Sequence, residues 1–229
     1  MRCIQGDNMS AHNIRIYKES DHLKVQEIFT SGCYEHIPAA FYCALRQPQS
    51  WLLLLVGLLV PLVMTGSILL SILGGIGVLL LLWLPGAVFF IFHAKNGVAK
   101  DLKDVRKYYL QRERYCFWVM EIEGEVVGTV AAIPYITPHE NNVELKRMMV
   151  SSHHRGKGIA KLLCRTVIDY ARKNGCNAVV LSTTSVQASG IGLYEKMGFK
   201  RTEIDLHNGI LQLIGMDWVG YRYDISFNK

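Results

Sequence analysis

The sequence predicts an α+β domain, in which strands and helices alternate along the chain, interrupted by a long hydrophobic insertion. Two observations lead to this prediction. A short strand, a glycine-bearing turn and an amphipathic helix follow one another between residues 143 and 175, and residues 51–92 contain no charged side chain. The 229 residues suffice for one domain of ordinary size with an appendage.

The chain before the hydrophobic block has the pattern of the beginning of this domain. Residues 1–13 show no periodicity and are expected to form a flexible N-terminus. Residues 14–50 are expected to supply the first strand and the helices that follow it, because Ile14 and Ile16 alternate with their neighbours and Phe29 lies on an apolar helix face.

The hydrophobic block, residues 51–92, is about twice the ~20 residues that one helix needs to cross a bilayer. Pro61, Gly66 and Ser67 interrupt it near its middle. We therefore expect a membrane-embedded insertion made of two spans. We do not expect this block to be a signal peptide, because it starts too far into the chain and is too long.

Residues 95–225 are expected to form the main part of the domain. A charged helix comes first, over residues 95–114, and a hairpin follows whose turn is Glu123-Gly124-Glu125. A strand over 144–150 then leads into the glycine-bearing turn and its helix. The remaining expected elements are a buried strand at 178–182, a helix at 186–197 and closing strands at 199–206 and 211–225.

The turn after the 144–150 strand has the chemistry of an anion site. Its sequence, Arg155-Gly156-Lys157-Gly158-Ile159-Ala160, combines two cations, two glycines and the first residues of a helix. The first N–H groups of a helix have no intrahelical partner, and the helix dipole favours negative charge there. We expect this turn to hold a pyrophosphate, although its R-x-x-G-x-A spacing is neither a dinucleotide fingerprint nor a Walker A motif.

Composition narrows the classes of partner. The formal net charge of +6 suits an anionic cofactor, a membrane surface or a nucleic acid. The cations form no Lys/Arg-rich block and no nucleic-acid motif is present, so direct nucleic-acid binding is not expected. The six cysteines form no C-x-x-C pair and no metal-binding spacing, so we expect no metal and a reducing compartment.

The R-x-x-G-x-A spacing resembles the acetyl-CoA signature of the GCN5-related N-acetyltransferase (GNAT) superfamily. A second element, GIGLYEKMGFK at residues 190–200, is similar to the A-x-x-L-Y-x-x-x-G-F element near the end of GNAT domains. It departs from that pattern at Gly190, where the family has alanine, and Gln187 stands where the family often has asparagine. The resemblance implies the GNAT fold, a mixed central sheet flanked by helices, with acetyl-CoA as co-substrate.

Further residues narrow the resemblance to one family. CFWV at residues 116–119 and HRxxGIAK at residues 154–161, with a hydrophobic insert after the first helix, are similar to the camello-like N-acetyltransferase 8 family. Its members are membrane-bound, and their acceptors include cysteine S-conjugates, protein lysines and, in the neuronal relative, aspartate. The resemblance implies a membrane-anchored N-acetyltransferase, with a small amine such as a cysteine S-conjugate as the expected acceptor. The alternatives are a protein-lysine (including histone) acetyltransferase and a non-catalytic CoA-binding membrane scaffold.

The same resemblance implies roles in a cofactor site. Backbone groups of Met149 and Val150 are expected to contact the pantetheine arm, and Gln187 is expected beside the cofactor. The N–H groups of residues 156–160 are expected to hold the pyrophosphate. Tyr194 is expected to protonate the departing thiolate, because a phenol with a pKa near ~10 can donate to a thiolate of comparable basicity.

The acceptor amine must lose a proton before or during its attack, which requires a base or a water chain. Glu144 is the first candidate, because it lies six residues before Val150, where lysine-acetylating GNAT enzymes carry a catalytic glutamate. A surface carboxylate at the start of a strand is the alternative interpretation. His139 and Glu140, in the loop before that strand, are the next candidates.

The position of the insertion also predicts a topology. If the segments before and after it belong to one domain, the block must cross the membrane an even number of times, as a helical hairpin or a re-entrant loop. Arg46 precedes it and Lys95 and Lys100 follow it, which the positive-inside rule interprets as two cytosolic flanks. The expected location is an internal membrane, the endoplasmic reticulum or Golgi. The alternative, a single span with a lumenal catalytic domain, would require the N-terminal segment to be detached from the fold.

Overall fold

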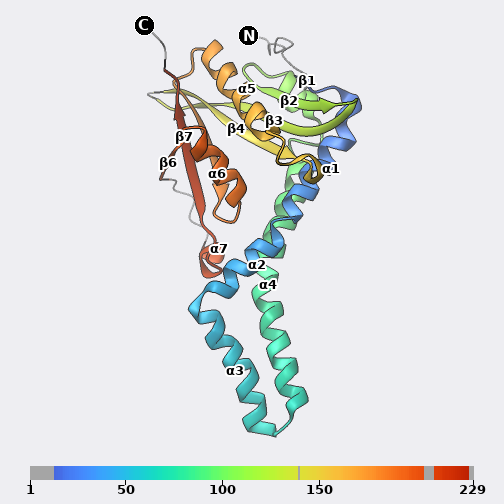
Figure 1. Ribbon diagram of the computed structural model, residues 1–229, viewed down its shortest axis with the longest axis vertical. Coiled ribbons are helices and arrows are strands. Elements are labelled where there is room, and N and C mark those ends of the chain that lie inside the picture. The colour runs from blue at the N-terminus through green and yellow to red at the C-terminus, as the bar shows by residue number, and fades with distance from the viewer. Residues whose placement is uncertain (1–12, 139, 204–208, 227–229) are drawn as a thin grey trace.

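The protein folds around a mixed sheet, and the computed structural model describes residues 13–138, 140–203 and 209–226 (Figure 1). Within these residues the sheet has seven strands in the order β1-β2-β3-β4-β5-β7-β6. Only β4 and β5 pair in parallel, and the other neighbours are antiparallel. The predicted fold class is thereby confirmed. The strands are β1 (Asn13–Ile16), β2 (Cys116–Ile122), β3 (Glu125–Ile136), β4 (Asn141–Val150), β5 (Ala178–Thr184), β6 (Lys200–Thr202) and β7 (Trp218–Asp224).

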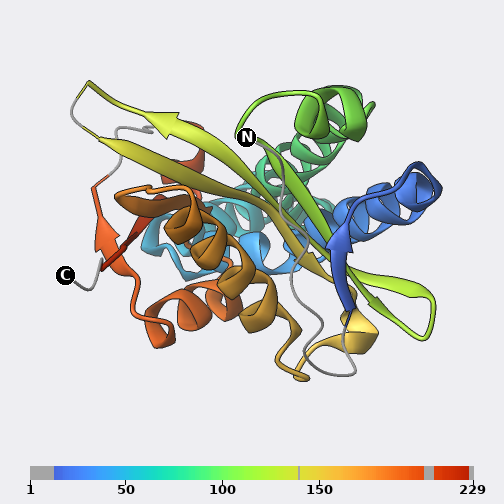
Figure 2. The same ribbon diagram turned by 90° about the horizontal axis from the view of Figure 1, so that it is seen from above.

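Helices cover both faces of the strands β2 to β4, because β2 alternates large apolar side chains on its two faces. Trp118 and Met120 pack under helix α5, whereas Phe117 and Val119 pack with helix α1 on the opposite face. Helices α5 and α1 lie on opposite sides of the sheet (Figure 2). The helices are α1 (His22–Tyr34), α2 (Ile37–Arg46), α3 (Pro48–Thr65), α4 (Ile68–Ala99), α5 (Ile159–Lys173), α6 (Ala188–Lys196) and α7 (Gly209–Leu213).

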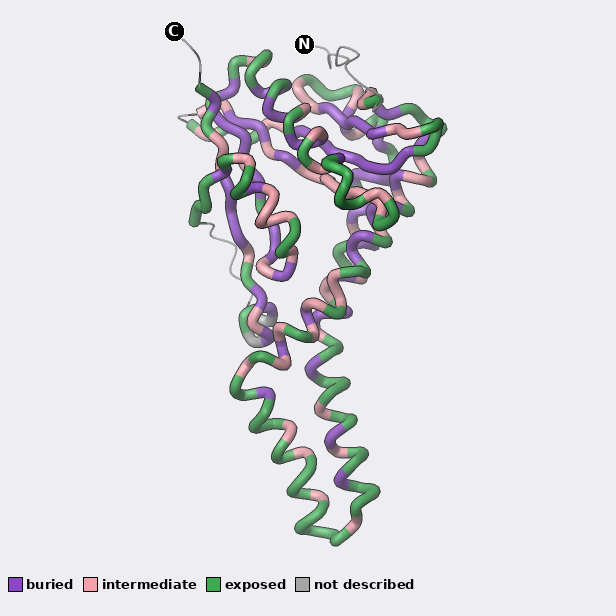
Figure 3. Tube along the Cα trace, viewed as in Figure 1, coloured by how far each residue is buried: buried purple, intermediate pink, exposed green. Residues whose placement is uncertain are grey.

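The hydrophobic block forms an antiparallel helical hairpin that projects away from the sheet (Figures 1 and 3). Helix α3 ends at Gly66, which adopts a left-handed conformation, and the Ser67 side chain then caps α4. The two helices approach closely at Gly57 and Gly74, since a Cβ added to Gly74 would collide with the Gly57 carbonyl oxygen. Both helices are long and apolar enough to cross a membrane.

Helix α4 is not confined to the hairpin. Its 32 residues span about 48 Å at 1.5 Å per residue, well beyond the ~30 Å of a bilayer core. The last turns pack against α1 and α2, where Phe90, Ala94 and Gly97 are buried. The predicted boundary at residue 92 therefore falls inside a continuous helix that runs from the hairpin into the domain.

Two segments differ in detail from the sequence-based expectations. The predicted 95–114 helix is instead the end of α4, an irregular turn and a short π-helix, Arg106–Leu110, because Asp101 turns inward to pair with Arg147. Part of the predicted closing strand at 211–225 is helix α7, whose Leu211 is buried beside α2 and α4. The predicted flexible N-terminus lies outside the described residues except for Asn13.

Candidate active site

The site lies where strands β4 and β5 separate. Their parallel pairing is confined to Val143 with Val179 and Glu144 with Val180. Beyond these positions β4 remains paired only with β3, and β5 remains paired only with β7, so β4 and β5 no longer pair with each other. Backbone groups of β4 that face β5 beyond Glu144 are therefore left for another partner, because each residue of a strand carries one donor and one acceptor.

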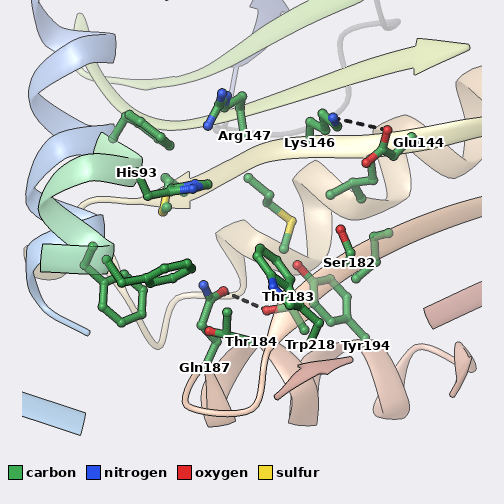
Figure 4. A pocket seen from close by; sticks show the side chains of 17 residues that line it. His93, Glu144, Lys146, Arg147, Ser182, Thr183, Thr184, Gln187, Tyr194 and Trp218 are labelled. Carbon is green, nitrogen blue, oxygen red and sulfur yellow. Dashed lines mark hydrogen bonds and ion pairs between the residues drawn. The ribbon is translucent and has the colours of Figure 1, made fainter. Parts of the chain in front are cut away.

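A pocket of about 230 Å³ opens in this gap (Figure 4). Its walls come from both separated strands, from helix α6, from the start of β7 and from the end of α4. The lining residues are Phe29, Phe89, Phe90, His93, residues 144–149, residues 181–184, Gln187, Tyr194 and Trp218. Three sequence-predicted site residues that lie far apart in the chain, Glu144, Gln187 and Tyr194, thus share one pocket.

The predicted pyrophosphate turn begins directly after β4. Gly156 and Gly158 adopt left-handed backbone angles, with φ values of 77° and 79°, and Gly158 precedes the first turn of α5. The first intrahelical hydrogen bond runs from Leu162 N to Gly158 O, so the N–H groups of residues 159–161 have no partner within α5. Cβ atoms added to the two glycines would meet no atom within 4 Å. The turn is thus an open cradle of donors that fits an anion.

The two predicted cations of the turn are held differently. The Arg155 guanidinium donates to the Val150 carbonyl at 3.1 Å and pairs with Glu35 of α1 at 2.5 Å. This fastens the turn to the end of β4. Lys157 is exposed. The positive charge of Arg155 is therefore partly neutralised by the Glu35 carboxylate and is only partly available to a bound anion.

The end of β4 is shaped by a bulge. The register with β3 shifts between Thr129 and Ala131, and Arg147 there has a φ of 53°, an unusual angle for a residue with a side chain. The Thr129 hydroxyl donates to the Arg147 carbonyl at 2.8 Å, which holds the bulge. Met149 and Val150 follow it, paired with Thr129 and Gly128, and Met149 lines the pocket.

Tyr194 stands on α6 and is 7% exposed. Its ring lies 5.7 Å from the Phe199 ring and 5.9 Å from the Tyr221 ring, so its position is set by packing. Burial raises the pKa of the Tyr194 hydroxyl, which keeps it protonated. Beside it, Gln187 is held by a 2.8 Å hydrogen bond that its side-chain oxygen accepts from Thr183.

Glu144 lines the pocket from β4, whereas Tyr194 lines it from α6 (Figure 4). Its carboxylate pairs with Lys146 at 3.3 Å. Glu140 lies elsewhere: the Arg222 guanidinium donates to both of its oxygens, at 2.6 and 2.9 Å, and Asn142 donates a further bond. His139 lies outside the described residues. Of the three predicted bases, the structure brings Glu144 into the pocket.

Sequence reasoning missed an aromatic wall of the pocket. Phe89 and Phe90 come from α4, Phe29 from α1 and Trp218 from β7, and His93 of α4 lies beside them. The Phe89 and Trp218 rings meet edge to face at 6.1 Å. Pro85 and the change to a histidine at position 93 were the available signals in the sequence, but the uniform hydrophobicity of residues 51–92 assigned Phe89 and Phe90 to the bilayer.

A mixed sheet that opens between two parallel strands, with a glycine turn at a helix N-terminus beside the opening, defines a GNAT-type acetyltransferase. Residues 88–199 match the Acetyltransferase (GNAT) family. A GNAT-family acetyltransferase from Staphylococcus aureus Mu50 shares the fold with a TM-score of 0.58 at 16% identity, covering 94% of this chain and 99% of that one.

Relatives that match nearly the whole chain assign it to one family within this class. N-acetyltransferase 8B of Homo sapiens is 36% identical over 219 residues, which cover 95% of this chain and 96% of that protein. The probable N-acetyltransferase camello of Xenopus tropicalis is 36% identical over 221 residues, covering 95% and 100%. The chain belongs to the N-acetyltransferase 8 (camello) family of GNAT enzymes. It is an acetyl-CoA-dependent N-acyltransferase.

Substituting Gly158 with alanine is expected to raise the KM for acetyl-CoA about tenfold. A left-handed angle costs an L-residue ~1–2 kcal/mol, and relaxing it would turn the N–H groups of the cradle away. Gly175→Ala is the matched control: Gly175 follows the other end of α5 with a φ of 65° and equally open space. Steady-state kinetics should show the KM change only for Gly158→Ala. An equal change in both variants would contradict the assignment of the cradle.

Proposed function

We propose that this protein is a membrane-anchored N-acetyltransferase that acetylates a small amine carrying an apolar group, with a cysteine S-conjugate as the representative acceptor. The observation that carries the acceptor class is the aromatic wall of Phe29, Phe89, Phe90 and Trp218. Each CH2 group buried against such a wall contributes ~0.8 kcal/mol, so an apolar S-substituent gains affinity that a peptide backbone or a carboxylate does not.

The chain supplies the groups that this reaction needs. Bound acetyl-CoA provides a thioester already activated for acyl transfer. Backbone groups of Met149 and Val150 would orient the pantetheine arm, and the turn at residues 156–160 would hold the pyrophosphate. Tyr194, protonated and packed in place, would give its proton to the leaving sulfur. Glu144 is the carboxylate that the family resemblance indicates as the acceptor of the amine proton.

Membrane anchoring is supported by the surface of the hairpin. In the most apolar 18-residue stretch of each helix, only 6% of the residues of α3 and 17% of those of α4 are buried (Figure 3). Long apolar side chains such as Leu52 and Leu69 are about two-thirds exposed, an arrangement that water penalises and a lipid bilayer accommodates. The hairpin therefore has the surface of a membrane insertion.

The flanks of the hairpin support an even number of crossings. Strand β1 precedes the block in sequence and pairs with β2, which follows it, so both flanks belong to one fold. Arg46 ends α2, and Lys95 and Lys100 are exposed near the end of α4, which favours a cytosolic domain by the positive-inside rule. The location we propose is an internal membrane, the endoplasmic reticulum or Golgi, with the domain facing cytosolic acetyl-CoA.

Thiol release from acetyl-CoA by the detergent-solubilised protein tests the acceptor class. The panel holds S-benzylcysteine, aspartate, a polyamine and a histone-tail peptide, and S-benzylcysteine is expected to be preferred. Phe89→Ala should raise the KM for this acceptor several-fold and leave that for acetyl-CoA unchanged. Phe92→Ala is the control, because Phe92 is exposed on the same helix and does not line the pocket. Preference for the histone peptide would assign the alternative, protein-lysine acetylation.

The topology is tested separately on intact microsomes with a tag placed after Lys229. Added protease is expected to remove the tag without detergent. Cleavage only after detergent would place the domain in the lumen and overturn the proposed orientation.

A further inference from the structure

Helix α4 carries one ionisable side chain into the pocket, His93. Figure 4 shows its ring projecting from α4 into the space between β4 and the Gln187–Tyr194 segment. The histidine follows directly on the uncharged block, at the point where α4 has left the hairpin and packs on α1. The pocket thus holds an imidazole in addition to the groups that the family pattern predicts.

Aromatic contacts orient this imidazole. Its ring is stacked on Phe89 at 6.1 Å with an interplanar angle of 22°, and it lies 6.0 Å from the Phe29 ring. Among the described residues, His93 makes ring contacts with Phe29 and Phe89, and neither of its ring nitrogens takes part in a hydrogen bond. A histidine held by its faces, with its nitrogens directed into a pocket, is arranged to exchange a proton with a ligand.

The chemistry favours this group over Glu144 as a proton acceptor. An imidazole ordinarily titrates near pH ~6.5 and a glutamate near ~4.3, and a general base works best when its pKa lies near the operating pH. Glu144 is also occupied by the ion pair with Lys146. The histidine stands beside the aromatic wall, where the acceptor would lie, whereas Glu144 stands on β4.

We propose that His93 is the general base of the acetyl transfer. The acceptor nitrogen gives one proton to a ring nitrogen of His93 while its lone pair forms the C–N bond. The C–S bond breaks, and the sulfur takes the proton of Tyr194. The imidazolium then returns its proton through water to the phenolate, so that amide and thiol are the net products. The proposal rests on the acetyl-transfer activity of the family and does not depend on which amine is the acceptor.

The charged surroundings of the ring determine how its titration is tested. Arg147 and Lys146 of β4 and Asp101 after α4 all act on it electrostatically. Glu144 of β4 and Tyr194 of α6 face the same pocket, and α1 contributes the uncharged ring of Phe29. Any variant that tests His93 must therefore leave these five ionisable groups in place.

His93→Gln in the full-length, detergent-solubilised protein is the test. The pH dependence of kcat at saturating acceptor reports ionisations of the bound complex, so free-amine titration does not intervene. Because desolvation in the pocket lowers the pKa of His93, the wild type is expected to lose activity with unit slope at a pH below the ordinary imidazole value of ~6.5. The variant should lose this limb and at least about 100-fold in kcat at pH 8, while the KM for acetyl-CoA stays within about twofold.

His36→Gln is the matched control, because His36 contacts Phe90 at 5.5 Å but does not line the pocket. It should keep the rate and the acid limb. Acetyl-CoA binding by calorimetry shows that each variant is folded, and His93→Asn replaces the glutamine variant if that one fails to bind. A folded His93 variant that keeps the acid limb would overturn the proposal, as would loss of the limb in Glu144→Gln alone. Absence of turnover in the wild type with every acceptor would instead contradict the proposed function.

Discussion

Tyr194→Phe is expected to lower kcat by about 10²–10⁴-fold, the range that a positioned general acid contributes. The substitution keeps the ring, which packs against Phe199 and Tyr221, and removes only the hydroxyl. Without the Tyr194 hydroxyl, the sulfur must leave as an unprotonated thiolate or take its proton from water. Thiol release under saturating acetyl-CoA and acceptor measures the loss.

Tyr170→Phe is the matched control for this prediction. Tyr170 is 7% exposed, as Tyr194 is, but it belongs to α5, packs against Trp118 of β2 and does not line the pocket. Its variant should retain full activity, and both variants should unfold at similar temperatures. Unchanged turnover in Tyr194→Phe would remove this residue from the mechanism.

The same assignment predicts the alkaline behaviour of the wild type. Because burial raises the pKa of Tyr194 above its ordinary 10.0, the phenol stays protonated and able to donate beyond pH 10. The loss of kcat through this group should therefore begin only above that pH. A decline with a midpoint near pH 8 that Tyr194→Phe abolishes would contradict it.

Asp101→Ala is expected to lower the free energy of unfolding by about 3–5 kcal/mol, the cost of leaving a buried ion-pair partner alone. Asp101 accepts two hydrogen bonds from the Arg147 guanidinium, at 2.8 and 2.6 Å, and a third from the Tyr109 hydroxyl. The guanidinium also lies 4.5 Å above the Phe29 ring. This cluster joins the end of α4 to the bulge of β4, so its loss should also loosen the pocket.

The pH dependence of this stabilisation has a definite sign. Burial alone would raise the pKa of Asp101, but the hydrogen bonds from Arg147 and Tyr109 and the charge of Arg147 lower it below its ordinary 3.8. A lowered folded-state pKa stabilises the protein above the unfolded value, and the stabilisation is lost as the pH falls through the folded value. The difference in the free energy of unfolding between the wild type and Asp101→Ala should therefore be largest at pH 7 and should decrease below pH 3.8.

Asp169→Ala is the control for the ion pair. Asp169 pairs with Arg172 at 2.7 Å on the exposed side of α5, with 60% of its side chain accessible. Exposed pairs contribute ~0–1 kcal/mol, so urea unfolding in detergent should separate the two variants clearly. Equal losses would mean that the Asp101 pair is no more than a surface contact.

Local patterns in the sequence determined much of the fold and part of the site. The strand, the R-x-x-G-x-A turn and α5 are contiguous, and their periodicity and glycines are properties of neighbouring residues. The element around Tyr194 is equally local. The uncharged length of residues 51–92 predicted the hairpin, because the length of a helix follows directly from its residue count.

The tertiary structure alone decided which distant residues meet. Arg147 and Asp101 are 46 positions apart, and nothing in their local patterns indicates that a bulge brings them together. Phe89 and Phe90 were predicted to lie in a membrane span, because hydrophobicity does not distinguish a lipid-facing side chain from one that faces a pocket. Periodicity shows which face of a helix is apolar, but what that face contacts depends on long-range packing. In α4, that packing makes one helix both an arm of the hairpin and a wall of the candidate active site.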